Sequence, residues 1–112
     1  MSLFKRDHWV RALSLADLWE GEMTGLRLGG VDLVLAHVPG GGVHAYDNRC
    51  PHGGSRLSAG TLDNLTLTCT THLWEFDART GEGIKPMGCR LRKFPVEVRA
   101  GEVWVRLSDH AS

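Results

Sequence analysis

Short stretches of alternating apolar and polar residues, separated by glycine, constrain the fold of this 112-residue chain more than any other feature. Two of them, residues 22–28 and 31–38, flank Gly29-Gly30, a pair that favours a two-residue β-hairpin turn. A second hairpin is expected where Ala100-Gly101 joins 94–99 to 102–107. One helical turn is expected to open at Ser14, and further strands at 9–13, 43–46, 65–68 and 74–76. The pattern predicts an all-β chain, a small antiparallel sandwich or barrel.

Length, composition and charge exclude several classes of protein. With 42% hydrophobic and 23% charged residues, the chain is expected to be one globular domain, residues 1–112. Thirteen Lys and Arg balance thirteen Asp and Glu, so nucleic-acid binding is not expected. No apolar run approaches the ~20 residues that cross a bilayer, and the first residues lack the apolar core of a secretory signal. We therefore expect a soluble, cytoplasmic protein without a membrane anchor, in which the tail 108–112 is loose.

Two cysteine–histidine pairs form the candidate site. Three cysteines are too few for a disulfide framework, but Cys50-Pro51-His52 and Cys69-Thr70-Thr71-His72 each place a thiolate and an imidazole in one tight turn. Four such ligands can hold a single tetrahedral zinc ion, or a [2Fe–2S] cluster with two cysteines on one iron and two histidines on the other. Zinc sites usually pair like ligands, whereas each pair here is mixed. The spacing therefore favours the two-iron cluster and leaves zinc as the alternative.

The two pairs, sixteen residues apart, resemble the Rieske iron–sulfur motif. The similarity extends over nearly the whole chain, and residues 72–74 and 83–86 resemble the ferredoxin branch of toluene monooxygenases. It implies a Rieske fold, in which a cluster-binding subdomain of two loops, at about 48–90, is set on a small antiparallel barrel or sandwich. It also implies that Cys50 and Cys69 bind the inner iron of one [2Fe–2S] cluster, that His52 and His72 bind the outer iron, and that residues 83–89 form a covering loop.

The function that this resemblance implies is electron transfer and not catalysis. A flavin-containing NAD(P)H reductase would load the protein, and the oxygenase component of an aromatic-ring monooxygenase, a diiron hydroxylase, would unload it. A ferredoxin of a ring-hydroxylating dioxygenase is the alternative within the family. The four intact ligands argue against a cluster-free Rieske-like subunit, and a structural Cys₂His₂ zinc interaction module is the alternative from another class. Because the histidine edges reach the surface in this family, we expect a monomer.

Four positions predict a low reduction potential. The respiratory branch of the family carries a disulfide at the positions of Ser55 and Thr71, and hydroxyl donors at those of Trp74 and Phe76. Ser55 and Thr71 cannot form the disulfide, and Trp74 and Phe76 have no hydroxyl to donate. Fewer hydrogen bonds to the cluster place the potential toward the negative end of the Rieske range, about −150 to +300 mV. Such a potential suits a donor to an oxygenase and does not suit quinol oxidation.

The remaining candidate residues have ordinary structural interpretations. Cys89 is expected to be a small thiol in the covering loop, and Trp74 to pack beside His72. Four histidines are expected to be structural or exposed: His8, His37, His44 and His110. Six basic residues are expected around the cluster, as a solvated face or as a docking rim for acidic partners: Arg49, Arg56, Lys85, Arg90, Arg92 and Lys93.

Overall fold

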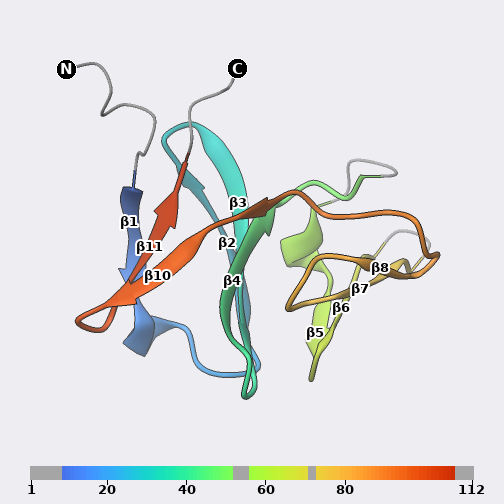
Figure 1. Ribbon diagram of the computed structural model, residues 1–112, viewed down its shortest axis with the longest axis horizontal. Helices are drawn as coiled ribbons and strands as arrows, with labels where there is room; N and C mark the ends of the chain where they lie inside the picture. The colour runs from blue at the N-terminus through green and yellow to red at the C-terminus, as the bar shows by residue number, and fades with distance from the viewer. Residues whose placement is uncertain (1–8, 52–55, 71–72, 108–112) are drawn as a thin grey trace.

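The computed structural model describes residues 9–51, 56–70 and 73–107, and its regular structure is almost entirely antiparallel β, in three sheets (Figure 1). The first sheet is formed by β1 (Trp9–Ser14), β11 (Glu102–Arg106) and β10 (Val96–Arg99). The second is formed by β2 (Met23–Leu28), β3 (Val31–Val38), β4 (Gly42–Asp47) and β9 (Lys93–Phe94). The third is formed by β5 (Thr61–Asp63), β6 (Thr66–Thr68), β7 (Glu75–Asp77) and β8 (Gly83–Lys85). The all-β prediction is confirmed.

The predicted hairpin and helical turn are both present. Gly29 and Gly30 have φ angles of 54° and 83°, and Leu28 pairs with Val31 across them. Positive φ at both central positions is the geometry that makes a two-residue turn follow the twist of its strands, and glycine adopts it without steric cost. The helical turn is a 3₁₀ helix, Leu15–Asp17, whose preceding Ser14 hydroxyl accepts the Ala16 N–H at 3.3 Å.

The second sheet lies between the other two and supplies buried residues to both sides (Figure 1). Successive residues of a strand point to opposite faces, so β3 sends Val34 and Ala36 to one hydrophobic core and Leu33 and Leu35 to the other. The cysteine core, on the side of the third sheet, consists of Val34, Ala36, Val38, Tyr46, Cys50, Leu57, Leu67, Cys69, Phe76, Ala78 and Leu91. The terminal-strand core, on the side of the first sheet, consists of Leu18, Leu33, Leu35, Ala45, Phe94, Val103, Val105 and Leu107.

One predicted strand is divided by the structure. Residues 94–99 were expected to form a single strand, but Phe94 pairs with Ala45 in the second sheet and Val96 pairs with Val105 in the first. Pro95 lies between them and has no N–H to donate to a continuous ladder. The expectation of one strand is therefore wrong, because the chain changes sheets at the proline.

Three short elements were not predicted: β5, β8 and the 3₁₀ helix Leu57–Ala59. Each has three residues. The equally short β6 and β7 were expected, because the residues around them show the β-branched or alternating pattern of a strand. Within the described ranges, no helix is long and apolar enough to cross a bilayer. The tail 108–112, with His110, and the N-terminal His8 lie outside the described residues. The single-domain organisation stays a prediction.

Candidate metal centre

Cys50 is held at the start of a loop whose two ends are joined. The residue follows β4 and is buried, with 1% of its surface exposed. The Leu57 N–H donates to the Asn48 carbonyl at 2.8 Å, and Arg49 forms an antiparallel bridge with Arg56. The chain from 49 to 56 therefore leaves the second sheet and returns to the same point. His52, the second predicted ligand of this loop, lies outside the described residues.

Cys69 occupies the matching position in a second closed loop. It directly follows β6 and is fully buried. Its N–H donates to the Trp74 carbonyl at 2.8 Å, which continues the pairing of Thr68 with Glu75 by one step. The turn between β6 and β7 is thus closed at its base by the cysteine backbone. His72 belongs to this turn and also lies outside the described residues.

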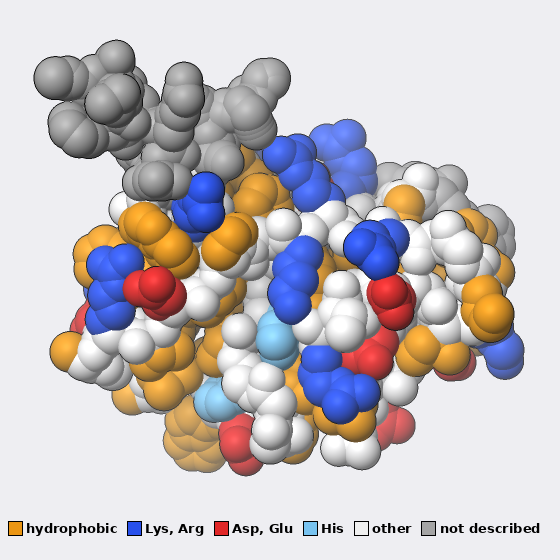
Figure 2. Space-filling model, in the orientation of Figure 1, with side chains coloured by type: hydrophobic (Ala, Val, Ile, Leu, Met, Phe, Trp, Pro, Cys, Tyr) orange, Lys and Arg blue, Asp and Glu red, His pale blue; other side chains and the backbone are white. Residues whose placement is uncertain are grey.

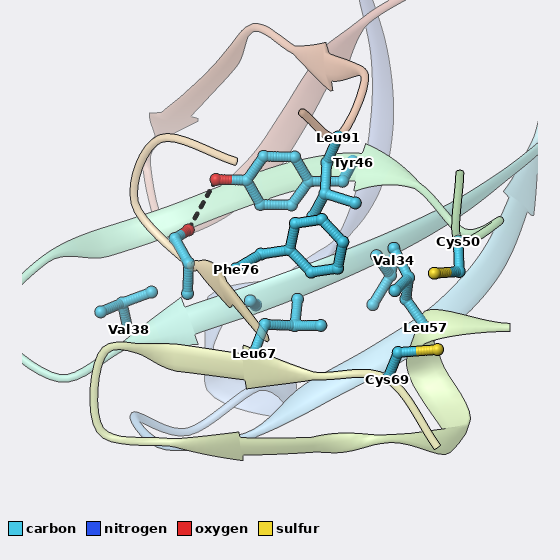
Figure 3. Packing of buried hydrophobic residues seen from close by; sticks show 11 residues of the cluster. Val34, Val38, Tyr46, Cys50, Leu57, Leu67, Cys69, Phe76 and Leu91 are labelled. Atoms are coloured by element: carbon cyan, nitrogen blue, oxygen red, sulfur yellow. Dashed lines mark hydrogen bonds between the residues drawn. The ribbon is translucent and has the colours of Figure 1, made fainter. Parts of the chain in front are cut away.

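The fold brings the two predicted cysteine ligands together. Both thiols lie at one end of the cysteine core, near Leu57, whereas the Tyr46 hydroxyl lies at the other end and donates to the Ala78 carbonyl at 2.6 Å (Figure 3). No disulfide forms among the described cysteines. Two buried thiols presented by two separate loops fit the thiolate half of a Rieske ligand set. Outside the four proposed ligands, the described ranges hold no group of three or more potential metal-binding side chains.

Cys89 lies in the loop expected to cover the cluster. It is half-buried and packs against the cysteine core, as does Trp74. The Gly83 N–H donates to the Cys89 carbonyl at 2.8 Å, and a Cβ on Gly83 would come within 2.5 Å of the Pro86 carbonyl oxygen. The loop therefore folds back so closely on β8 that this position requires glycine.

Three large apolar side chains in β8 and in the turns beside β7 and β8 are exposed, a feature that the sequence did not lead us to expect. Leu73 is 64% exposed, Ile84 46% and Met87 77%. Glu75 pairs with Lys85, so Leu73, two residues before Glu75, and Met87, two residues after Lys85, lie at the same end of the β7–β8 ladder. The signal available in the sequence was that Leu73 directly follows the predicted turn 69–72, and that Ile84 and Met87 are large apolar residues within the predicted covering loop. Large exposed side chains grouped in this way commonly mark a contact surface.

The predicted basic residues are exposed, and most have a local partner. Arg56 pairs with Asp32 at 2.7 Å and Arg90 with Glu82 at 2.8 Å. The Lys93 ammonium donates to the Arg79 carbonyl at 2.6 Å, and the Arg92 guanidinium lies 5.2 Å from the centre of the Phe94 ring. Figure 2 shows several basic side chains beside acidic ones on the visible face. This arrangement is that of a solvated face with both signs of charge.

The two described histidines have structural roles, as expected. His37 Nδ1 lies 2.7 Å from the Leu18 carbonyl oxygen, and His44 Nε2 lies 2.8 Å from the Gly41 carbonyl oxygen. Burial lowers the pKa of His44 from its ordinary value of 6.5, and the hydrogen bond to Gly41 partly opposes this shift. Both side chains belong to β3 and β4, away from the two cysteine loops.

Comparison with known proteins agrees with this geometry. Residues 8–95 match the family model described as the Rieske [2Fe-2S] domain. The chain is 34% identical over 101 residues to the ferredoxin component of the naphthalene 1,2-dioxygenase system of Pseudomonas putida, covering 89% of this chain and 96% of the relative. It is 36% identical over 98 residues to the ferredoxin component of the alkene monooxygenase system of Xanthobacter autotrophicus, covering 87% and 80%.

A solved structure shows the same fold. A chain in the complex of reduced oxygenase and oxidized ferredoxin in carbazole 1,9a-dioxygenase superimposes with a TM-score of 0.79 and 32% identity, covering 88% of this chain and 92% of that one. The residues matched by the family model, 8–95, include both cysteine loops and every strand of the second and third sheets. The chain therefore belongs to the Rieske [2Fe–2S] domain family.

Proposed function

We propose that Cys50, His52, Cys69 and His72 hold a [2Fe–2S] cluster and that the protein is a ferredoxin carrying single electrons to an oxygenase. The observation that carries this proposal is the meeting of two buried cysteines from two closed loops at one end of the cysteine core. Each loop also contains one of the two histidines at the spacing of the motif. A bound cluster would supply reversible one-electron chemistry.

The surroundings of the cysteines are suited to holding a redox centre. Leu57, Leu67 and Phe76 are fully buried beside them, so the thiolate side is shielded from water. Two thiolates bring less negative charge than the four of a plant-type cluster, which makes uptake of an electron easier. Among the side chains that form this core, only Tyr46 has a hydroxyl, and it donates to the Ala78 carbonyl. Phe76 has no hydroxyl to offer. This supports a low potential within the Rieske range.

Partner proteins would contact the end of the molecule that carries both loops. Leu73, Ile84 and Met87 offer a few exposed apolar contacts there, which suits an encounter that must form and dissociate at each electron transfer. We place an NAD(P)H-dependent flavin reductase upstream, as the family resemblance implies. We place an oxygenase component downstream, because the relatives are named as ferredoxin components of a dioxygenase and a monooxygenase system. Because NAD(P)H is a cytoplasmic reductant, we place the protein in the cytoplasm. We expect it to act as a monomer.

The acceptor that we propose is the diiron hydroxylase of an aromatic-ring monooxygenase. The support is the similarity of residues 72–74 and 83–86 to the toluene monooxygenase ferredoxins, together with the relative from an alkene monooxygenase system. A ring-hydroxylating dioxygenase is the second candidate, supported by the relative from the naphthalene system.

Reconstitution tests the function and the acceptor together. The chemically reduced protein is mixed with a diiron hydroxylase or with a mononuclear-iron dioxygenase, and the oxidised product is measured against the electrons supplied. We expect product with the hydroxylase; product with the dioxygenase alone would contradict the acceptor, and product with neither would contradict the carrier role.

The same assay tests the contact surface. Met87→Ser should slow the transfer of electrons to the oxygenase. Trp19→Ser changes another highly exposed apolar residue, far along the chain, and should leave the transfer unchanged.

A further inference from the structure

We infer that Asn48 is a positioning residue that fixes the first cluster loop, an inference that rests on the proposed cluster. Asn48 is the one buried polar residue among those that the structure describes, with 1% of its surface exposed. It lies between the end of β4 and Cys50, two residues before the proposed ligand. A buried amide is costly unless its donors and acceptors are satisfied, so its presence requires a physical reason.

The backbone of Asn48 joins the loop to the second sheet. Its N–H donates to the Asp32 carbonyl on β3 at 2.9 Å, and its carbonyl accepts the Leu57 N–H at 2.8 Å. The first bond anchors the start of the 49–56 loop to a central strand. The second ties the residue after the loop to the residue before it. The backbone of a single residue therefore connects the sheet, the loop entrance and the loop exit.

The side chain of Asn48 repeats this connection. Its Oδ1 accepts the Ser58 N–H at 2.8 Å, and its Nδ2 donates to the Ser58 hydroxyl at 2.9 Å and to Asp32 Oδ1 at 3.3 Å. The amide thus bonds Ser58 in two directions and also contacts β3. Both Nδ2 hydrogens and Oδ1 are used, so the side chain has one well-defined orientation.

Asp32 and Gly25 complete the arrangement from two neighbouring strands. The second carboxylate oxygen of Asp32 accepts from Arg56 Nη2 at 2.7 Å, so Asp32 holds the loop exit as well as the Asn48 amide. A Cβ at Gly25 of β2 would lie 2.6 Å from the Ser58 hydroxyl and 2.8 Å from Asn48 Nδ2. Glycine at this position therefore leaves the space in which the Asn48–Ser58 pair fits.

The consequence for the proposed cluster is rigidity of one ligand pair. Cys50 and His52 both lie within the loop whose ends Asn48 holds together, and Leu57, at its exit, belongs to the same core as Cys50 and Cys69. Removing the amide would leave the part-buried Ser58 N–H and hydroxyl without these partners, while the backbone bonds of residue 48 to Asp32 and Leu57 would remain. The loop would then sample more conformations, and the two ligands would be held less firmly against the metal.

The experiment compares Asn48→Ala with Tyr46→Phe in the purified holoprotein. Tyr46→Phe is the matched control, because it also removes a buried hydrogen bond of the cysteine core, but at the end away from the loop. Three quantities are measured: the melting temperature, the rate of iron release to a chelator, and the linewidth of the electron paramagnetic resonance spectrum of the reduced cluster. We expect Asn48→Ala to release iron about tenfold faster and to broaden the spectrum, as for residues that orient metal ligands. Tyr46→Phe should lower the melting temperature without either change.

Two outcomes overturn the inference, and they are separable from failure of the proposed function. Equal rates of iron release in the two variants, at similar losses of melting temperature, would make Asn48 an ordinary stabilising residue. If Asn48→Ala does not accumulate as folded protein, Ser58→Ala removes only the hydroxyl that accepts from Nδ2, and unchanged release in that variant would equally overturn the inference. A wild-type protein without a Rieske spectrum would instead contradict the proposed function, and this inference with it.

Discussion

The two cores of this protein share the strands β3 and β4 but differ in what they enclose. The terminal-strand core contains only aliphatic side chains and one phenylalanine, and Val103 and Val105 of the C-terminal hairpin close it. The cysteine core contains two thiols and a tyrosine hydroxyl, and loops instead of long strands close one of its ends. The comparison shows that one strand with strictly alternating side chains can serve a purely structural core on one face and a chemical site on the other.

The difference extends to the elements around each core. The first sheet has strands of four to six residues, whereas all four strands of the third sheet have three. Short strands leave more of the chain in turns, and turns are where the backbone can wrap around a metal site. The loop of Cys50 leaves the second sheet after β4 and that of Cys69 leaves the third sheet after β6, whereas the first sheet carries neither proposed ligand loop.

The largest expected effect is loss of the cluster on Cys50→Ser. Removing one thiolate from a ligand set with only two leaves too few bonds to the inner iron, so the purified protein should contain almost no iron or acid-labile sulfide. Cys89→Ser is the matched control, because this third cysteine packs against the same core but is not a proposed ligand. Full iron content in Cys50→Ser, or loss of iron in Cys89→Ser, would contradict the ligand assignment.

A substitution in each core tests their separation. Leu35→Ala and Leu67→Ala both empty a fully buried site, and each should lower the free energy of unfolding by about 2–5 kcal/mol. Only Leu67→Ala removes a side chain from the core of the cysteines, so it alone should alter the spectrum of the reduced cluster. Denaturant unfolding and electron paramagnetic resonance measure the two effects. Equal spectral changes in both variants would show that the cores are not independent.

The charge of the ligand set determines the next effect. His72→Cys replaces a neutral imidazole by a thiolate, so the reduced state becomes less favourable and the potential should fall by about 100 mV or more, toward the values of all-cysteine clusters. At ~59 mV per tenfold for one electron, this corresponds to about 2 kcal/mol. Redox titration of the variant checks the shift. A potential that is unchanged or higher would argue against His72 as a ligand.

The smallest expected effect is on the pH dependence of stability, through His44 of β4. Burial holds the pKa of His44 below 6.5, so near that pH the unfolded chain binds a proton that the folded protein does not. Stability should therefore fall as the pH is lowered through about 6.5 and toward the folded pKa, and His44→Asn should weaken this dependence. Denaturant unfolding at several pH values measures the difference between the two proteins. Identical pH profiles would assign the dependence to other groups.

Much of the fold was predictable because it depends on local chemistry. Gly29-Gly30 specifies its hairpin through backbone geometry, and the alternation in 31–38 identifies a central strand. The path of the chain at Pro95 was not predictable in the same way, because apolar residues on both sides resemble one continuous strand. Only the pairing partners, Ala45 and Val105, reveal that two sheets are involved.

The candidate site, too, was predictable only where it depends on local sequence. Cys50 and Cys69 could be identified from their spacing to a histidine, which is a property of the sequence alone. Asn48 could not, because its importance depends on Asp32 and Ser58, sixteen and ten residues away along the chain. A polar residue next to a turn is ordinarily exposed, and nothing in the local sequence distinguishes this one. Interactions that are distant in sequence become visible only in the structure.

The central claim is that this protein carries a [2Fe–2S] cluster bound by two cysteines and two histidines. The most direct test is an electron paramagnetic resonance spectrum of freshly purified protein, recorded before and after anaerobic reduction with dithionite. We predict a coloured protein that is silent when oxidised and shows a rhombic signal with a low average g value when reduced. A signal of the all-cysteine type would remove the histidines from the iron. Silence in both states, with zinc found by metal analysis, would make the protein a zinc module and contradict the account.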